Sequence, residues 1–299
     1  MKKYLCALAF VFLFAFAAAT PAHAAGPKVV IGDGLFAEIK LVHRMLKMLI
    51  EEHTALTVEI QSEMTPINSW NQLTKGAINV YLAYDGTVLA TFLRQDPSTI
   101  PDGMALYEYV HDAIARDFNI AMLGKLGMNN TYAVAVREET AKELDLHTLS
   151  DLAAAAENLV FGAEHEFFSL EGSMHFRPMS NFYNLKFKSI RPIDVGLKYM
   201  AMENKNIDVT VVYATDGLNR KAQLTILPDD KHFFPEYNAV VLARQDLLDA
   251  APDLEKVLRM LDGQFTDEVM TGLSYAVDVD ERPLDDVAAE FLREKGLIR

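Results

Sequence analysis

Cysteine is almost absent from this 299-residue sequence, and the one that occurs, Cys6, lies in an apolar run near the N-terminus. The rest of the chain must therefore be held together by its hydrophobic core rather than by disulfides, and its length is ample for such a core. The same absence leaves no cysteine nucleophile for catalysis beyond that run. The length also allows two lobes.

Long apolar runs are likewise missing after the N-terminal one, so no second segment is long enough to span a bilayer. Lys2 and Lys3 precede the first run and the small-residue pattern Ala22-His23-Ala24 follows it. This order is typical of a secretory signal peptide, and a retained membrane anchor is the alternative. We expect cleavage after residue 24 and a periplasmic protein. A lipid anchor would need a cysteine at the cleavage point, and Cys6 lies too early.

Basic residues are scarce: 28 lysines and arginines stand against 42 acidic residues, a formal net charge of −14. Removal of residues 1–24 takes two lysines away and brings the net charge to about −16. Nucleic acid requires a basic footprint, and so does tight docking on anionic lipid. We therefore expect neither as a partner.

Catalytic motifs are also lacking. Gly32-Asp33-Gly34 has neither the third glycine of a dinucleotide fingerprint nor the lysine of a P-loop. Glu164-His165-Glu166 has no second ligand pair at a spacing typical of a metal site, and no Gly-x-Ser-x-Gly elbow occurs. We expect no enzyme, no metal and no cofactor. An enzyme on a two-lobed α/β scaffold is the alternative, and it would need a nucleophile or metal set that the sequence does not offer.

What is present is an alternation of short strands and helices. The pattern predicts strands at 28–32, 56–61, 78–84, 131–137, 159–162, 209–213, 224–227 and 239–243. It predicts helices at 36–52, 69–75, 106–118, 149–156, 196–203, 247–263, 267–277 and 284–296. This order indicates an α/β fold with mainly parallel sheets covered by helices. Since no Pro/Gly-rich spacer occurs, we expect the chain to pass between two lobes along strands.

Tyrosines gather near the predicted strand ends, where α/β folds present ligand sites. Tyr81 and Tyr84 close one strand, and further tyrosines follow at Tyr107, Tyr109, Tyr132, Tyr199, Tyr213 and Tyr237. Each alone is an ordinary half-buried residue, but together they favour a shared aromatic pocket. Such a cage suits a quaternary ammonium group, because each ring face contributes about 0.5–1 kcal/mol, or about 2 kcal/mol when desolvated.

With these residues in place, the chain resembles the binding proteins of ABC importers for osmoprotectants of the glycine betaine, carnitine and choline type. The resemblance runs from about residue 28 to 298. Its main segments are KVVIGDGLFAE at 28–38, GAINVYLAYDGT at 76–87, LGMNNTYAVAVR at 126–137, LVFGAEHEF at 159–167, YATDG at 213–217 and LPDDKHFFPEY at 227–237.

The resemblance implies a two-lobed periplasmic-binding-protein fold of type II, with two strand crossovers as its hinge. Residues 27–130 and 238–299 would form lobe 1, and residues 131–237 would form lobe 2. It further implies a quaternary-ammonium ligand between the lobes and an ABC permease of the inner membrane as partner. We expect the protein to be a monomer.

The same resemblance selects the site residues. Tyr81, Tyr107 and Tyr213 are the main candidates for an aromatic cage around the ammonium head. Weaker candidates are Tyr84, Tyr132 and Tyr199, and Asn130 lies at the first expected crossover.

The sequence also departs from the family pattern. Asp85 stands where the family has threonine, and the stretch after Glu166-Phe167 lacks the arginine that would pair with a betaine carboxylate. Arg177 lies a few residues on and is a possible replacement. A cleft that gains Asp85 and loses a cation favours a net cation such as choline over a zwitterion. A different small polar or cationic solute, or a sensor that presents its ligand to a receptor, stays open.

Overall fold

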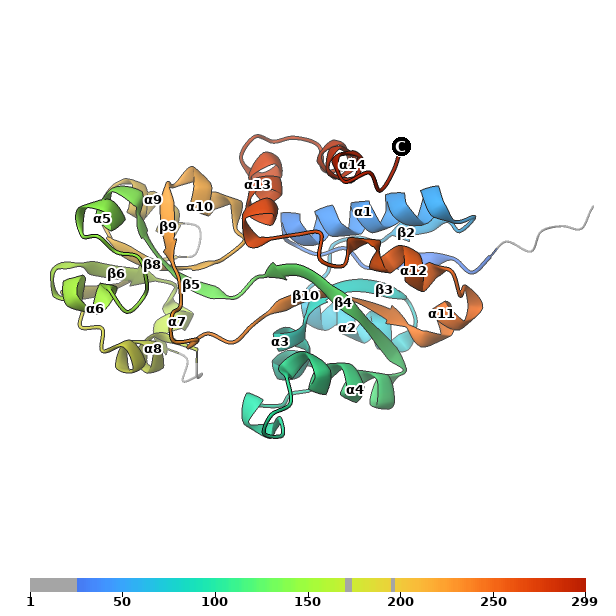
Figure 1. Cartoon of the computed structure of the whole chain (residues 1–299), viewed down its shortest axis with the longest axis horizontal. Coiled ribbons are helices and arrows are strands. Elements are labelled where there is room, and N and C mark those ends of the chain that lie inside the picture. The colour runs from blue at the N-terminus through green and yellow to red at the C-terminus, as the bar shows by residue number, and fades with distance from the viewer. Residues whose placement is uncertain (1–25, 170–173, 195–196) are drawn as a thin grey trace, which may run out of the picture.

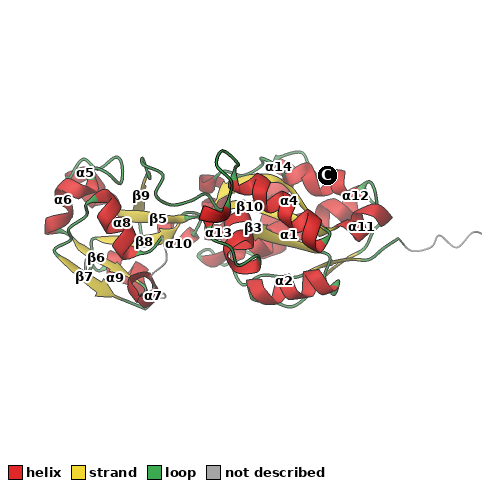
Figure 2. Ribbon diagram, turned by 90° about the horizontal axis from the view of Figure 1, so that it is seen from below, coloured by secondary structure: helices red, strands yellow, loops and turns green. Residues whose placement is uncertain are grey.

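The computed structural model describes residues 26–169, 174–194 and 197–299, and it contains two five-stranded sheets at opposite ends of an elongated molecule (Figures 1 and 2). We call the part built on the sheet β2-β1-β3-β10-β4 lobe 1, and the part built on β7-β6-β8-β5-β9 lobe 2. The expected two-lobed α/β fold is confirmed. The expected signal peptide lies outside the described residues.

Lobe 1 has a mixed sheet with helices on both faces. Its strands are β1 (Val29–Ile31), β2 (Val58–Ile60), β3 (Val80–Tyr84), β4 (Ile120–Asn129) and β10 (Asn238–Arg244). One face is covered by α1 (Ala37–His53), α11 (Gln245–Ala250), α12 (Leu254–Leu258), α13 (Asp267–Asp278) and α14 (Leu284–Glu294). The other is covered by α2 (Pro66–Lys75), the π-helical turn Val88–Phe92 and α4 (Leu106–Phe118). The short turn α3 (Asp85–Thr87) follows β3 directly.

Lobe 2 repeats this plan on a smaller scale. Its strands are β5 (Tyr132–Arg137), β6 (Val160–Ala163), β7 (Ser189–Pro192), β8 (Val209–Tyr213) and β9 (Leu224–Leu227). Its helices are α5 (Glu138–Glu143), α6 (Leu152–Ala155), α7 (His165–Ser169), α8 (Phe176–Tyr183), α9 (Lys198–Glu203) and α10 (Gly217–Lys221). A phenylalanine-rich core around Phe161 fills one side of the sheet, where its ring meets four other phenylalanine rings.

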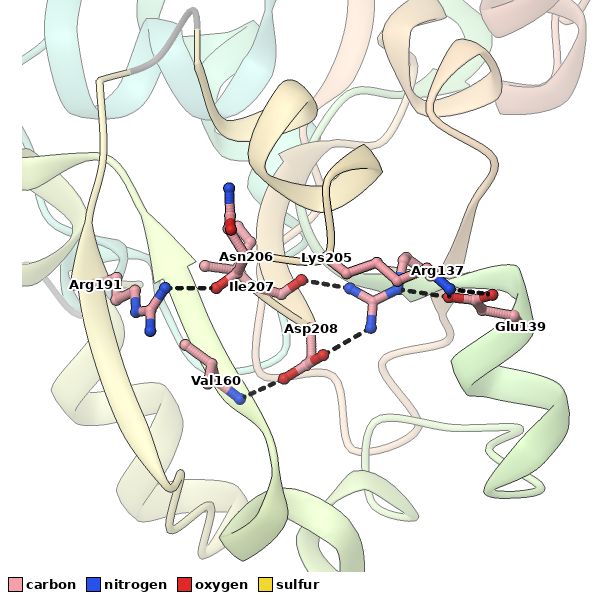
Figure 3. A network of polar contacts seen from close by, with 8 residues as sticks. All are labelled: Arg137, Glu139, Val160, Arg191, Lys205, Asn206, Ile207 and Asp208. Atoms are coloured by element: carbon pink, nitrogen blue, oxygen red, sulfur yellow. Dashed lines mark hydrogen bonds and ion pairs between the residues drawn. The ribbon is translucent and has the colours of Figure 1, made fainter.

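A polar network ties the lobe 2 strands together at the edge drawn in Figure 3. Arg137, at the end of β5, donates to Asp208 over 2.6 Å and to the carbonyl of Ile207. Asp208 also accepts a hydrogen bond of 2.9 Å from the amide of Val160 at the start of β6. Since Arg137 and Asp208 are mostly shielded from water, this pairing fixes the entry of β8 between β5 and β6.

The chain passes between the lobes twice, from β4 to β5 and from β9 to β10, and the two crossover segments run side by side. The amide of Asn130 donates to the carbonyl of Tyr237 over 3.1 Å, and the amide of Tyr237 donates to the side chain of Asn129 over 2.7 Å. The hydroxyl of Thr131 donates to the carbonyl of Pro235 over 2.9 Å. These bonds make one two-stranded connection out of two segments far apart in the sequence. The lobe boundaries at 130/131 and 237/238 stay a prediction.

Strand direction differs from the sequence expectation of mainly parallel sheets. β1 runs parallel to β2 and β3, and β6 runs parallel to β7 and β8. In contrast, β10 is antiparallel to β3 and β4, and β5 is antiparallel to β8 and β9. The reason is that β5 and β10 enter their sheets from the crossovers rather than through a helical connection, which is what makes successive strands parallel. Both sheets are therefore mixed.

Within the described residues, no helix is both long and apolar enough to cross a bilayer.

Candidate ligand-binding site

A cavity of about 610 Å³ lies between the lobes, and side chains of both lobes line it. Tyrosines dominate its wall: Tyr81, Tyr84, Tyr132, Tyr199, Tyr213 and Tyr237. The volume falls within the range of small-molecule pockets, about 300–1,000 Å³. Asn130, at the first crossover, lines the cavity as well.

The lobe 1 wall is built on the end of β3. Tyr81 is 2% exposed, and burial raises the pKa of its phenol above the ordinary value. Tyr84 donates its hydroxyl hydrogen bond to the carboxylate of Glu38, and burial with this neighbouring charge raises the pKa of Tyr84 well above 10. Both rings are therefore neutral at pH 7 and offer π faces to a ligand.

The lobe 2 wall is built on the paired strands β5 and β8, which place Tyr132 opposite Tyr213. Their rings stack with centroids 5.2 Å apart and planes at 20°. Tyr213 keeps 41% of its surface exposed. Tyr199, on α9, is held by a hydrogen bond of 2.5 Å from its hydroxyl to Asp216. The sequence prediction that Tyr81, Tyr84, Tyr132, Tyr199 and Tyr213 share a pocket thus agrees with their places in the cavity wall.

Tyr237 also lines the cavity, although the sequence prediction left it out of the site. Its ring lies against Gly86, where an added Cβ would come within 2.7 Å of the ring carbons. A side chain at position 86 would displace the ring, so glycine is required there for Tyr237 to reach the wall. The signal in the sequence was the place of Tyr237 next to the second crossover.

Glu38 is the main polar contact between the lobes within the cavity wall, and the sequence prediction missed it. Its carboxylate accepts hydrogen bonds from Tyr84 of lobe 1, from Asn130 at the crossover and, over 2.5 Å, from Thr215 of lobe 2. Glu38 is 5% exposed, and burial raises the pKa of its carboxyl although the three donors oppose this shift. The position could have been suspected, because Glu38 ends the first family-like segment.

Two further carboxylates, Asp216 and Asp278, line the cavity where α1, α10 and α13 meet. Burial, followed by the charge of Asp216, raises the pKa of Asp278. The charge of Asp216 acts in the same direction on Glu38. These three carboxylates are therefore close enough to influence one another, and we call them the acidic pole of the cavity.

A lysine, Lys198 on α9, lines the wall as well and was also missed. Its ammonium donates to Glu164 over 2.5 Å and to the carbonyl of Val211 over 3.0 Å. It lies 5.4 Å from the ring centroid of Tyr199 and 5.9 Å from that of Tyr213. Lys198 is only 2% exposed, a rare degree of burial for lysine that its pairing with Glu164 explains. In the sequence it is an isolated charge between apolar helix residues.

Two predicted site residues lie away from the cavity wall. Tyr107 is on α4, where its hydroxyl donates to the carbonyl of Leu123 over 2.8 Å. Asp85 is fully buried and accepts hydrogen bonds from the amide of Gly86 and from the amide and side chain of Asn238, at 2.7 to 2.9 Å. The expectation that Asp85 faces the cleft therefore needs correction: its carboxylate fastens β3 to the start of β10.

Arg177, the possible replacement for the missing arginine, is an exposed residue in the first turn of α8 and does not line the cavity. The stretch that lacks the arginine lies partly outside the described residues. Glu164, considered above as a metal ligand, is instead the partner of Lys198. Over the described ranges, no group of three or more His, Cys, Asp or Glu side chains is arranged to hold a metal ion.

Comparison with known proteins gives a consistent picture. The family model described as the substrate binding domain of ABC-type glycine betaine transport systems matches residues 27–294. A carnitine transport binding protein of Listeria monocytogenes is 32% identical over 268 residues, which cover 89% of this chain and 86% of that protein. An ergothioneine transport permease/ergothioneine binding protein of Helicobacter pylori is 33% identical over 225 residues, or 75% of this chain, but this match spans only 40% of the Helicobacter protein.

Among solved structures, a crystal structure of a glycine betaine/carnitine/choline ABC transporter protein superposes with a TM-score of 0.84 at 29% identity. The superposition covers 91% of this chain and 99% of that one. Family model, relatives and fold agree over nearly all of the described residues. The chain belongs to the family of substrate-binding domains of ABC-type glycine betaine transport systems.

Proposed function

We propose that this protein captures a small solute with a quaternary ammonium group between its lobes and delivers it to an ABC permease of the inner membrane. The observation that carries this proposal is the wall of six tyrosines, drawn from both lobes, around one cavity. Membership of the family and the relative named as a carnitine transport binding protein support it. The N-terminal pattern supports export to the periplasm, with residues 1–24 removed.

The chemistry of the wall suits such a head group. A quaternary ammonium ion donates no conventional hydrogen bond, so its recognition depends on ring faces and on nearby negative charge. Neutral phenol rings supply the first, and the acidic pole of Glu38, Asp216 and Asp278 supplies the second. Four ring faces at about 1 kcal/mol or more each would provide about half of the roughly 8 kcal/mol that micromolar binding requires.

Thermal unfolding of the purified protein tests the proposal. We expect glycine betaine, carnitine, choline or ergothioneine to raise the melting temperature, because a ligand at 100 times its Kd stabilises the native state by about 2.7 kcal/mol. The matched control ligand is 3,3-dimethylbutanoate, in which a tert-butyl group replaces the trimethylammonium of glycine betaine. Equal stabilisation by the control, or none by any quaternary ammonium solute, would contradict the proposal.

A pair of tyrosine variants locates the binding site. Tyr81→Leu removes a ring from the wall while it keeps most of the side-chain volume, and we expect it to weaken binding about two- to thirtyfold. Tyr107→Leu removes a ring that lies away from the wall and is expected to leave the affinity unchanged. Calorimetric titration of both variants measures the difference, and equal losses would mean that the wall is misplaced.

A further inference from the structure

The described wall of the cavity carries charge of both signs, at different places. Lys198 is the one lysine or arginine among the described lining residues, and it lies beside strands β6 and β8 of lobe 2. The acidic pole lies where α1, α10 and α13 meet. Tyr199 lies between the two charges: its ring centroid is 5.4 Å from the Lys198 ammonium, and its hydroxyl donates to Asp216 over 2.5 Å. A ligand in the cavity therefore meets a cation beside β6 and β8 and carboxylates beyond Tyr199.

The pair formed by Lys198 and Glu164 presents its cation to the cavity. Lys198 lines the wall and Glu164 does not. An ammonium group has three N–H donors, and two of those of Lys198 are used by Glu164 and the carbonyl of Val211. One donor is left for a ligand acceptor, and a carboxylate is the acceptor that gains most from a charged donor.

Lys198 also changes the role of two predicted cage residues. Its ammonium already lies within 6 Å of the ring centroids of Tyr199 and Tyr213, the range of a cation–π contact. A second cation placed against these rings would meet a like charge nearby. In the part of the chain that the structure describes, no lysine or arginine lies within cation–π range of the rings of Tyr81 and Tyr84, and Tyr84 contacts the carboxylate of Glu38. The head group is therefore expected at the lobe 1 wall and not at Tyr199 and Tyr213.

We propose that Lys198 binds the carboxylate of a zwitterionic solute whose quaternary ammonium head lies toward Tyr81, Tyr84 and the acidic pole. The protein would then select betaines over choline. This inference rests on the proposed function and names its substrate class. It replaces the preference for a net cation that the sequence suggested, since Asp85, on which that preference depended, lies outside the wall.

The first test changes the ligand and leaves the protein intact. Glycine betaine and carnitine are each titrated against the wild-type protein beside their methyl esters, which keep the trimethylammonium head but lose the negative charge. For whichever betaine binds, we expect its ester to bind about ten- to a hundredfold more weakly, the usual loss for a charged hydrogen bond. Choline is expected to behave like the esters.

The second test changes the pair. Lys198→Met alone would leave the Glu164 carboxylate buried without a partner, a change that threatens folding, so it is combined with Glu164→Gln. We expect this double variant to lose the preference for betaine over ester, with betaine affinity reduced about ten- to a hundredfold and ester affinity kept. Lys231→Met is the control. Lys231 also lies over a tyrosine ring, 5.2 Å from the ring centroid of Tyr183, but neither residue lines the cavity.

The outcomes separate the two levels of the argument. If the wild-type protein binds a betaine and its ester equally well, or if the double variant keeps the wild-type ratio, Lys198 does not anchor a carboxylate, while the proposed function stands. If the wild-type protein binds none of these solutes, the proposed function is wrong and the inference falls with it. A ratio that changes equally in the Lys231→Met control would show that the effect is not specific to Lys198 and would overturn its role.

Discussion

At the scale of single residues, the buried carboxylates have different roles. Glu38 joins the lobes, Glu164 holds Lys198, and Asp85 fastens Asn238 to the end of β3. Burial raises the pKa of Asp85 to about 6, against the effect of its three donors. Asp85 therefore takes up a proton within an accessible pH range, and this can be measured.

The variant Asp85→Asn tests this role. Asp85 has a pKa of about 6 in the folded protein and near 3.8 in the unfolded chain, so the folded state holds the proton more tightly. The stabilisation that results is fully present below about pH 3.8 and is lost as the pH rises through about 6. The difference in free energy of unfolding between wild type and variant should therefore shift by up to about 3 kcal/mol between pH 4 and pH 7. Denaturant titrations at several pH values measure it. A difference that does not vary with pH would contradict the burial of Asp85. The ratio of betaine to choline affinity should not change.

At the scale of elements, α10 of lobe 2 packs directly on α13 of lobe 1, away from the crossovers (Figure 1). Residues of both helices line the cavity. Gly217, the first residue of α10, lies so close to α13 that an added Cβ would come within 2.5 Å of the amide nitrogen of Tyr275. The guanidinium of Arg220 lies over the ring of Tyr275 at 5.1 Å. This contact is a further link between the lobes, besides the crossovers and the hydrogen bond of Thr215 to Glu38.

We expect Gly217→Ala to separate α10 from α13, because the clashing atoms are backbone and have no rotamer to escape to. The radius of gyration from small-angle scattering should increase. Gly272→Ala is the control on α13 itself, since the nearest atom to its added Cβ is an Arg220 nitrogen at 3.9 Å. This second change should leave the radius unchanged and, as a helix-interior alanine, stabilise the protein by about 0.5–1 kcal/mol. Equal radii for both variants would show that the link between α10 and α13 does not hold the lobes together.

The elements also show what the sequence could and could not predict. Apolar spacing located α4 at Leu106–Phe118 and β8 at Val209–Tyr213, because each buries one face or both faces in a core. It gave no signal for β7, whose four residues are all exposed at a sheet edge, and it missed β4, whose pairing with β10 is irregular. Lys198 and Glu38 escaped prediction for another reason: the partners of a charged helix residue are distant in the sequence, and only the fold brings them together.

At the scale of the whole molecule, two lobes with separate cores are joined by two adjacent crossovers. Few backbone bonds at the crossovers resist a rotation of one lobe against the other, whereas the ligand-lining residues come from both sides. A ligand that contacts both walls favours the arrangement in which they approach each other. This is the mechanical basis of the proposed capture.

We expect a saturating solute to reduce the radius of gyration of the wild-type protein. If the lobes are already closed without the solute, the radius should stay at its minimum. The Gly217→Ala variant provides the contrast: its larger radius should contract when the solute is added, because ligand contacts oppose the clash. Small-angle scattering with and without the solute that gives the largest thermal shift measures both. A variant that binds the solute without contracting would be inconsistent with a clamp.

Four residues of the cavity wall, Asn130, Thr131, Tyr132 and Tyr237, lie on or next to the crossovers. A substitution at any of them alters the hinge as well as the wall. During evolution, a substitution that changes the ligand preference at these positions would therefore also change how the lobes move. Tyr81 and Lys198 lie within their lobes and are free of this constraint. Divergence toward new solutes within the family is therefore expected to begin at positions like these, with the crossover residues following only when the hinge has adapted.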